Sequence, residues 1–232
     1  MPVPTEPFPF AARLARVRAR LSEAGANVFI VTELNNIRYL TGFAGSAGIL
    51  VVTAGDSRLL VDGRYDAIVA EGQASGTIAP LDVIRVKKYD PALIETIAGG
   101  GWRRLAFEGD HTTVAQYGRW VHGLPDVTCT PVYDWVESGR IKKDDRELAI
   151  LRRAGRLLSG VAEALGQWVA VGKTEREVAG DIDAALRRAG FEKPATTNWS
   201  LSFSVAPSQS LVSASECKFF SRVQANTREP GG

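Results

Sequence analysis

Residues 36–46, with the sequence Asn-Ile-Arg-Tyr-Leu-Thr-Gly-Phe-Ala-Gly-Ser, separate two apolar runs of the chain. The first run covers residues 28–31 and the second covers residues 47–52. Short apolar runs bounded by turn residues are typical of buried strands, so both flanks are predicted to be strands. The segment between them is predicted to form a compact turn, because glycine permits positive φ and close backbone approach. The glycines concerned are Gly42, Gly45 and Gly48.

This turn has two interpretations. In the first it is functional, and Arg38 and Tyr39 place a fixed cation and a phenol at the mouth of a strand. In the second it is a structural corner, with Tyr39, Leu40 and Phe43 packed beneath it. The pattern alone favours the structural corner.

Length and composition indicate a globular protein of one large domain or two small ones. The chain has 232 residues, of which 45% are hydrophobic, and such a content can fill a core. Its 28 basic and 26 acidic residues are spread along the sequence, and the formal net charge is only +2. This balance gives no electrostatic reason to expect nucleic-acid binding.

The cysteines and the N-terminus suggest a cytoplasmic location. Cys129 and Cys217 lie far apart in the sequence without His or Cys at metal-ligand spacing, which predicts free thiols in a reducing compartment. The first ten residues lack a basic segment followed by an apolar one, and no apolar segment reaches spanning length. Neither a signal peptide nor a membrane helix is therefore expected.

The first helix is predicted from apolar residues at helical spacing, with Gly25 as its stop. The apolar residues are Phe10, Leu14, Val17 and Leu21, and the arginines predicted on the opposite, solvated face are Arg13, Arg16, Arg18 and Arg20. An arginine run of this kind could attract an acidic partner, but a solvated helix face is the favoured interpretation.

Residues 48–53 and 57–62 are predicted to form an antiparallel hairpin, because a short Ala-Gly-Asp segment joins two apolar runs. Asp62 follows as a helix N-cap that could also hold Arg64. In a functional interpretation Asp62, Arg64 and Tyr65 belong to a polar rim or a subunit contact. The alternative is capping plus a surface ion pair worth at most about 1 kcal/mol.

From residue 82 onward strand and helix patterns alternate, which predicts an α/β layer. The predicted strands are 83–86, 104–107 and 127–131, and the predicted helices are 91–98 and 113–121. The glycines at 99–101 form no phosphate loop, because they precede a strand and no Lys-Ser or Lys-Thr follows them. His111 and His122 each stand alone, so surface or capping roles are favoured over metal ligation.

After the charged residues 141–145 the pattern changes to long helices. An apolar stripe begins at Leu148, and Thr174 with Glu177 predicts a capping box for a second helix, which Gly190 ends. Residues 199–205 alternate apolar residues and serine, as in a strand. The predicted divisions are therefore a disordered tail (1–9), an α/β domain (10–140), an incomplete second domain (141–206) and a poorly ordered tail (207–232).

Three stretches together resemble the family of Xaa-Pro aminopeptidase (aminopeptidase P), prolidase and creatinase. The first is Asn-Ile-Arg-Tyr-Leu-Thr-Gly-Phe at 36–43 with Gly45 and Ser46, and the second is Asp-Gly-Arg-Tyr at 62–65. The third comprises 141–147, 151–154, 172–175, 177–179 and 190–195. The resemblance implies a creatinase-like N-terminal domain, a mixed sheet flanked by helices, followed by an incomplete α+β segment of the pita-bread catalytic domain.

The resemblance also implies a family reaction, the release of an N-terminal residue from a peptide with proline in second position. In the family, two divalent metals, usually manganese or cobalt, are held by two Asp, one His and two Glu. This sequence has no Asp after Asp183 and no His after His122. No catalytic residue and no metal ligand is therefore assigned, no cofactor is expected to bind this chain alone, and the chain is predicted to be a truncated and inactive member.

Two other interpretations stay open beside the truncated peptidase. The chain could be a non-enzymatic binding or dimerisation module, which pairs with itself or with a full-length homologue, or it could be a nonfunctional gene fragment. The candidates for a substrate rim or a subunit contact are Arg38, Tyr39, Arg64 and Tyr65. A peptide substrate is expected only for the complete family enzyme, and neither nucleic acid nor membrane is expected as a partner.

Overall fold

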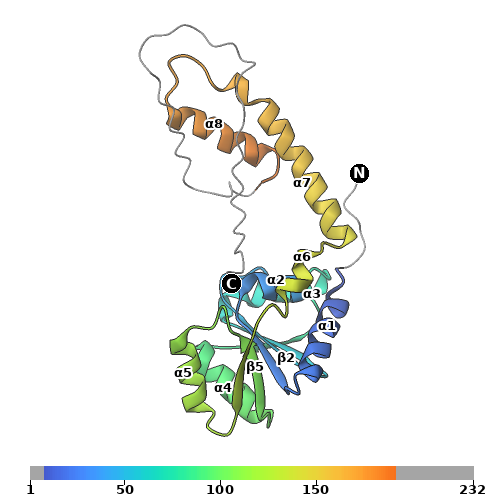
Figure 1. The fold of residues 1–232 in the computed structure, drawn as a ribbon. Helices are drawn as coiled ribbons and strands as arrows, with labels where there is room; N and C mark the ends of the chain where they lie inside the picture. Colours follow the sequence, from blue (N-terminus) through green and yellow to red (C-terminus); the bar gives the residue numbers. More distant parts are fainter. Residues whose placement is uncertain (1–7, 192–232) are drawn as a thin grey trace, which may run out of the picture. The chain divides into compact units, whose positions relative to one another are not determined.

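The computed structural model describes residues 8–191, which divide into two compact units (Figure 1). The first unit extends to Leu157 and the second begins at Leu158. The boundary predicted at 140/141 stays a prediction. The tail predicted after 207, the strand predicted at 199–205, Cys217 and most of the N-terminal tail lie outside the described residues. Within 8–191, no helix is long and apolar enough to cross a membrane.

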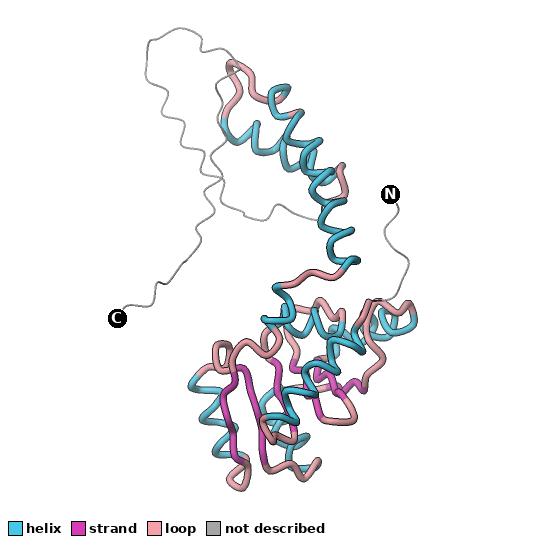
Figure 2. Tube along the Cα trace, turned by 45° about the vertical axis from the view of Figure 1, so that its right-hand side comes forward, coloured by secondary structure: helices cyan, strands magenta, loops and turns pink. Residues whose placement is uncertain are grey.

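The first unit contains one mixed six-stranded sheet in the spatial order β4-β3-β2-β1-β5-β6. Its strands are magenta in Figure 2. Pairs β1/β2 and β2/β3 are antiparallel, and pairs β1/β5, β5/β6 and β3/β4 are parallel. The predicted mixed sheet and the predicted hairpin are therefore confirmed. The strands are β1 (Val28–Val31), β2 (Ile49–Thr53), β3 (Ser57–Val61), β4 (Asp82–Arg85), β5 (Arg104–Glu108) and β6 (Thr128–Val132).

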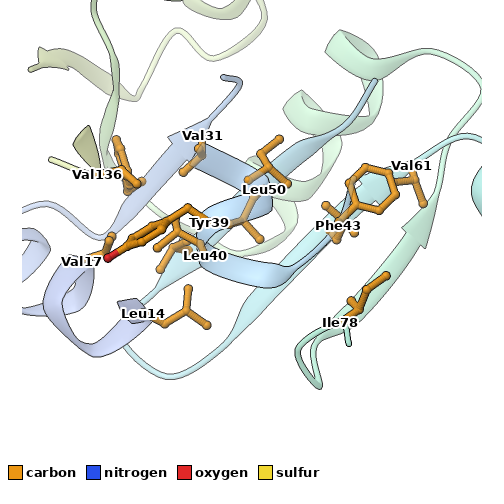
Figure 3. Close-up of a cluster of buried hydrophobic side chains, with 14 of the residues drawn as sticks. Leu14, Val17, Val31, Tyr39, Leu40, Phe43, Leu50, Val61, Ile78 and Val136 are labelled. Carbon is orange, nitrogen blue, oxygen red and sulfur yellow. The ribbon is translucent and has the colours of Figure 1, made fainter. Parts of the chain in front are cut away.

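Helices cover both faces of this sheet, because the side chains of its central strands alternate between two hydrophobic clusters. Phe29 and Val31 pack in the cluster that includes α1, α2 and α3, and part of that cluster is drawn in Figure 3. Val28 and Ile30 pack in the cluster that includes α4 and α5. The helices of this unit are α1 (Phe10–Glu23), α2 (Leu34–Thr41), η1 (Gly63–Tyr65), α3 (Asp66–Ala74), α4 (Tyr89–Gly99), α5 (Val114–Gly123), α6 (Glu137–Ile141) and the start of α7 (Asp145–Glu163).

The compact turn predicted at 36–46 is wrong for its first half, which is the helix α2. The Glu33 side chain caps this helix by accepting a hydrogen bond from the backbone N–H of Asn36 at 2.6 Å. Gly42 ends it with φ +82°, and a Cβ at this position would lie 2.1 Å from the carbonyl oxygen of Thr77. Tyr39, Leu40 and Phe43 are buried, as the structural-corner interpretation predicts.

The arginines of α1 do not form a purely solvated face. Arg13 is only 3% exposed, and Arg18 donates hydrogen bonds to the Thr53 carbonyl at 3.0 Å and to Ser57 Oγ at 3.1 Å. Both side chains fasten the helix to other parts of the first unit. The prediction fails because an arginine beside an apolar stripe can bury its stem and pair its guanidinium with groups that are distant in sequence.

The described part of the second unit contains the end of α7, η2 (Leu165–Gln167) and α8 (Glu175–Arg188). The predicted capping box of Thr174 and Glu177 is confirmed, and Gly190 follows the helix with φ +94°. The buried cluster here is small and comprises Val161, Ala185 and Leu186. Leu158 of the predicted stripe is 51% exposed, so this unit buries only part of its apolar surface.

Candidate functional site: the carboxyl edge of the sheet

Five strands of the sheet end at the same edge, because β1, β3, β4, β5 and β6 run in one direction. The chain leaves β1 toward β2 on one side, while β5, on the other side of β1, begins the second half of the sheet. Such a topological switch point is where open α/β sheets usually place ligands, just outside the carboxyl ends of the strands. The candidate site is therefore this edge, and its residues lie at the end of β5 and in the segments that follow β1, β3 and β6.

Glu108, the last residue of β5, fills the switch point with a buried carboxylate. One of its oxygens, Oε2, accepts hydrogen bonds from the backbone N–H of Thr32 at 2.6 Å and of Glu33 at 2.7 Å. The other, Oε1, accepts one from Asn36 Nδ2 at 2.7 Å. The position at which a ligand would usually bind therefore holds a side chain of the protein itself, which ties β5 to the start of α2.

Asn36 links this carboxylate to α6. Its Nδ2 also donates to Glu137 Oε1, and its Oδ1 accepts from Arg140 Nη1 at 2.8 Å. Arg140 lies 3.7 Å from the Glu33 carboxylate. We call Glu33, Asn36, Glu108, Glu137 and Arg140 the edge network. Asn36 is 0% exposed with both ends of its amide satisfied, so the network fixes α2 and α6 over the end of the sheet.

The two carboxyl groups on either side of Asn36 titrate differently. Burial raises the pKa of Glu108, although its hydrogen bonds to Asn36 and to the amides of residues 32 and 33 oppose the shift. For Glu137, burial opposes the shift, but hydrogen bonds from Asn36 and from backbone amides lower the pKa. Of these two carboxyl groups, Glu108 therefore takes up a proton more readily than Glu137 as the pH falls.

A second polar cluster, the Asp62 cluster, follows β3. The Asp62 carboxylate accepts hydrogen bonds from Arg64 Nε and Arg64 Nη2, both at 2.9 Å, and from the Tyr89 hydroxyl at 3.0 Å. The hydrogen bond from Arg64 is the largest cause that holds the pKa of Asp62 well below its usual value. Burial, followed by the bond to Asp62, raises the pKa of Tyr89 to about 12. Asp62 thus acts as the predicted N-cap and holds Arg64, as expected.

The four predicted rim residues fall into two exposed and two buried side chains. Arg64 and Arg38 are exposed, whereas Tyr65 is 7% exposed and Tyr39 is 8% exposed. The Tyr65 hydroxyl accepts a hydrogen bond from the Ser46 N–H at 3.1 Å. Within residues 8–191, Arg38 has no ion pair or hydrogen-bond partner for its side chain. The structure brings Arg64 together with Tyr65, with the guanidinium 5.3 Å from the ring centroid.

The histidines do not create a metal site in the part of the chain that the structure describes. His111 Nε2 lies 3.9 Å from Glu137 Oε1, and no group of three His, Cys, Asp or Glu residues among residues 8–191 could hold a metal ion. Cys129 is a free thiol whose pKa burial raises. The edge network therefore offers a structural and electrostatic framework, and its described residues do not fit a two-metal catalytic centre.

A model of the Creatinase/Prolidase N-terminal domain matches residues 13–142, which is more than half of the 232 residues. The chain belongs to this family. The match ends within the segment that joins α6 to α7, and it includes every member of the edge network and of the Asp62 cluster. Both polar clusters are accordingly features of the creatinase-type domain of this chain.

Two similar proteins are about twice as long as the part that aligns with this chain, and a third is of nearly the same length as that part. An uncharacterized peptidase of Bacillus subtilis (strain 168) is 27% identical over 184 residues, which cover 78% of this chain and 50% of the relative. The Xaa-Pro dipeptidase from Bacillus anthracis shares the fold with a TM-score of 0.69 at 24% identity, over 79% of this chain and 50% of that one. An Xaa-Pro aminopeptidase structure from Streptococcus pyogenes has a TM-score of 0.50 at 27% identity, over 56% of this chain and 95% of that one. The chain thus spans about half the length of the first two relatives.

Pattern reasoning on the creatinase-type domain found the Asp62–Arg64 pair but missed Tyr89 of the Asp62 cluster and most of the edge network. The signal for Glu108 is a single carboxylate that ends an otherwise apolar strand, Arg-Leu-Ala-Phe-Glu. A charged residue at the end of a buried strand is unusual unless it is paired, so it could have been singled out. Its partners could not, because 72 to 76 residues separate it from Asn36, Glu33 and Thr32.

Glu108 should give the unfolding free energy a measurable pH dependence. A carboxyl group with a raised folded-state pKa binds more protons when folded, so its contribution to stability is full below pH 4.5 and is lost as the pH rises through the folded pKa. The slope for one proton is at most about 1.4 kcal/mol per pH unit. Chemical unfolding from pH 4 to pH 8 should show this falling contribution in the wild-type chain and not in Glu108→Gln.

The control for this experiment is Asp62→Asn, since the folded-state pKa of Asp62 is lowered and its contribution has the opposite sign. That contribution is present above pH 3.8 and is lost as the pH falls below it. Asp62→Asn should therefore leave the profile between pH 5 and pH 8 unchanged. An identical profile for the wild type and Glu108→Gln would show that Glu108 does not titrate in this range.

Proposed function

We propose that this chain supplies the N-terminal domain of an Xaa-Pro peptidase-type metallopeptidase and that the chain itself lacks the catalytic centre. The observation that carries the proposal is the family match over residues 13–142, together with relatives of which the chain spans about half. The reaction to which it would contribute is the release of an N-terminal residue that precedes proline. The proposed compartment is the cytoplasm.

In this proposal the residues of the catalytic centre lie outside this chain, whose sequence has no Asp after Asp183 and no His after His122. A dinuclear site of manganese or cobalt needs several oxygen and imidazole donors that converge, so that a bridging water is activated and the scissile carbonyl is polarised. Among residues 8–191 no three such donors lie together. We therefore infer that this chain is inactive by itself and that a peptide substrate binds only when a complete catalytic half is present.

The proposed contribution of the domain is an exposed cationic rim made of Arg38 and Arg64. Arg64 is 69% exposed at its side chain, and Asp62 orients its guanidinium through two hydrogen bonds. Such a fixed guanidinium can bind a carboxylate of a peptide or of a neighbouring subunit. Tyr65 is buried and supports Arg64 in this proposal, since the guanidinium lies 5.3 Å from its ring centroid. Tyr39 is buried against Arg13 instead and has no role in the proposed rim.

A domain exchange tests this role. Residues 13–142 would replace the matching domain of the Bacillus anthracis Xaa-Pro dipeptidase, whose solved chain has the same fold. We expect the chimera to cleave Xaa-Pro peptides and Arg64→Ala to raise its KM about tenfold with kcat nearly unchanged, as for the loss of one charge-assisted contact.

The matched control is Arg103→Ala, which removes an exposed arginine paired with Asp126 at 3.2 Å beside the opposite edge of the sheet. This variant should leave KM unchanged. Equal effects of the two substitutions, or an unchanged KM in Arg64→Ala, would exclude the proposed rim. A chimera that folds but does not cleave would contradict the assignment of the domain.

A binding or dimerisation module is the second candidate, and one observation favours it. The sheet of the first unit is covered on both faces, and the chain covers 95% of a solved Xaa-Pro aminopeptidase chain from Streptococcus pyogenes. We infer that a domain of this length folds by itself. Sedimentation velocity of the purified chain, alone and with a full-length homologue, separates the candidates. A stable complex would support the module, and a monomer in both samples would exclude it.

A further inference from the structure

The segment between β6 and the first turn of α7, residues 133–147, is fastened along its length to α1 and α2. We call this segment the strap. Arg20 on α1 donates to the Asp134 carbonyl at 3.0 Å and to Ser138 Oγ at 2.9 Å. The Tyr39 hydroxyl on α2 donates to the Gly139 carbonyl at 2.9 Å. The strap is therefore held to the domain at several points and is not a free linker.

Arg13 holds the C-terminal end of the strap from inside the domain. Its Nη1 donates to the Tyr39 carbonyl at 2.7 Å, and its Nη2 donates to Asp144 Oδ2 at 2.6 Å and lies 3.4 Å from Glu147 Oε1. The guanidinium carbon is 4.0 Å from the centre of the Tyr39 ring. A 3% exposed cation with this set of partners has a fixed position, because it is paired on one side and stacked on the other.

The two carboxylates that Arg13 contacts are also the capping box of α7. The Asp144 side chain accepts a hydrogen bond from the Glu147 N–H at 2.9 Å, and the Glu147 side chain accepts one from the Asp144 N–H at 3.0 Å. A capping box satisfies backbone donors that the first turn of a helix otherwise leaves unpaired. Its two acids would repel each other without a cation nearby, and Arg13 supplies that cation.

We propose that Arg13 is a positioning residue, which couples the folding of α1 to the formation and placement of the first turn of α7. In this arrangement the contacts of α1 with the strap fix the residue at which α7 begins and the position of its first turn in the first unit. The proposal concerns residues 8–157 alone and does not depend on the proposed peptidase role. A second contact agrees with it, since the Arg146 guanidinium lies 3.7 Å from the centre of the Phe8 ring at the N-terminal side of α1.

Hydrogen exchange and limited proteolysis of the full chain test this coupling. In Arg13→Gln, the amides of Asp144, Glu147 and Leu148, which are hydrogen-bonded in this turn, should exchange about tenfold or more faster. The turn can then open without breaking the contacts of Arg13 with Asp144 and Glu147. Trypsin should cut after the exposed Lys142 and Lys143 faster by a similar factor. Asp144→Asn should give the same direction of change, although asparagine keeps the N-cap hydrogen bond.

The matched control is Arg18→Gln, which removes an arginine of the same helix that binds Thr53 and Ser57 rather than the strap. This substitution should change the amide hydrogen-exchange rates in the first turn of α7 by less than about twofold. The double variant Arg13→Gln/Asp144→Asn should open the strap no more than the larger single change, because both remove one interaction. Equal opening in Arg18→Gln, unchanged exchange in Asp144→Asn, or multiplied effects in the double variant would each overturn the proposal.

Discussion

Replacing Val51 or Leu60 by aspartate should lower the free energy of unfolding by about 4 kcal/mol or more, which is enough to unfold a large share of the molecules. Both side chains are 0% exposed and lie on central strands, packed against the cluster that includes α4 and α5. A carboxylate there loses its hydration and gains no partner. Urea unfolding followed by circular dichroism measures the change.

The control for these variants is Val83→Asp on the edge strand β4, where the valine is 39% exposed. The same chemical change should cost less than about 1 kcal/mol there, because the carboxylate reaches water. Wild-type midpoints for Val51→Asp and Leu60→Asp would show that the two-sided core is assigned incorrectly. A large effect in all three variants would mean that burial does not determine the loss.

The sequence predicted the elements whose signals are local. The hairpin of β2 and β3 follows from two apolar runs around a short turn, and the capping box of α8 follows from Thr174 and Glu177, three residues apart. Both are confirmed because nearby residues supply the stabilising contacts. The later strands and helices of the sheet domain were also predicted from patterns within short segments of the sequence.

The helix α2 was missed because its evidence lies outside the segment itself. Its cap is Glu33, which precedes the quoted stretch, and its glycine stop is required by the approach of the Thr77 carbonyl, 35 residues later. Asparagine and threonine in the segment have modest helix propensity, so local preference favoured a turn. Tertiary contacts overrode that preference.

In the candidate site, too, contacts between residues close in sequence were predicted and contacts between distant residues were not. Asp62 and Arg64 are two residues apart and were predicted as a pair, whereas Glu108, Asn36 and Arg140 meet only through the topology of the sheet. Arg13 was assigned to the solvated face of α1 although it stands three residues after Phe10 and four before Val17, on the buried face. The prediction placed Arg13 in solvent because arginine is charged, although its spacing from Phe10 and Val17 indicates the buried face.

The central claim is that this chain provides a creatinase-type domain but not the catalytic centre of the peptidase. Purified full chain, titrated calorimetrically with manganese and assayed with an Xaa-Pro peptide at saturating metal, should show neither two stoichiometric sites nor turnover above the buffer rate. The Bacillus anthracis Xaa-Pro dipeptidase is the positive control, and enzymes accelerate their reactions by about a millionfold or more. Stoichiometric binding of two ions together with peptide turnover would contradict the account, because the missing donors would then lie within this chain or between its copies.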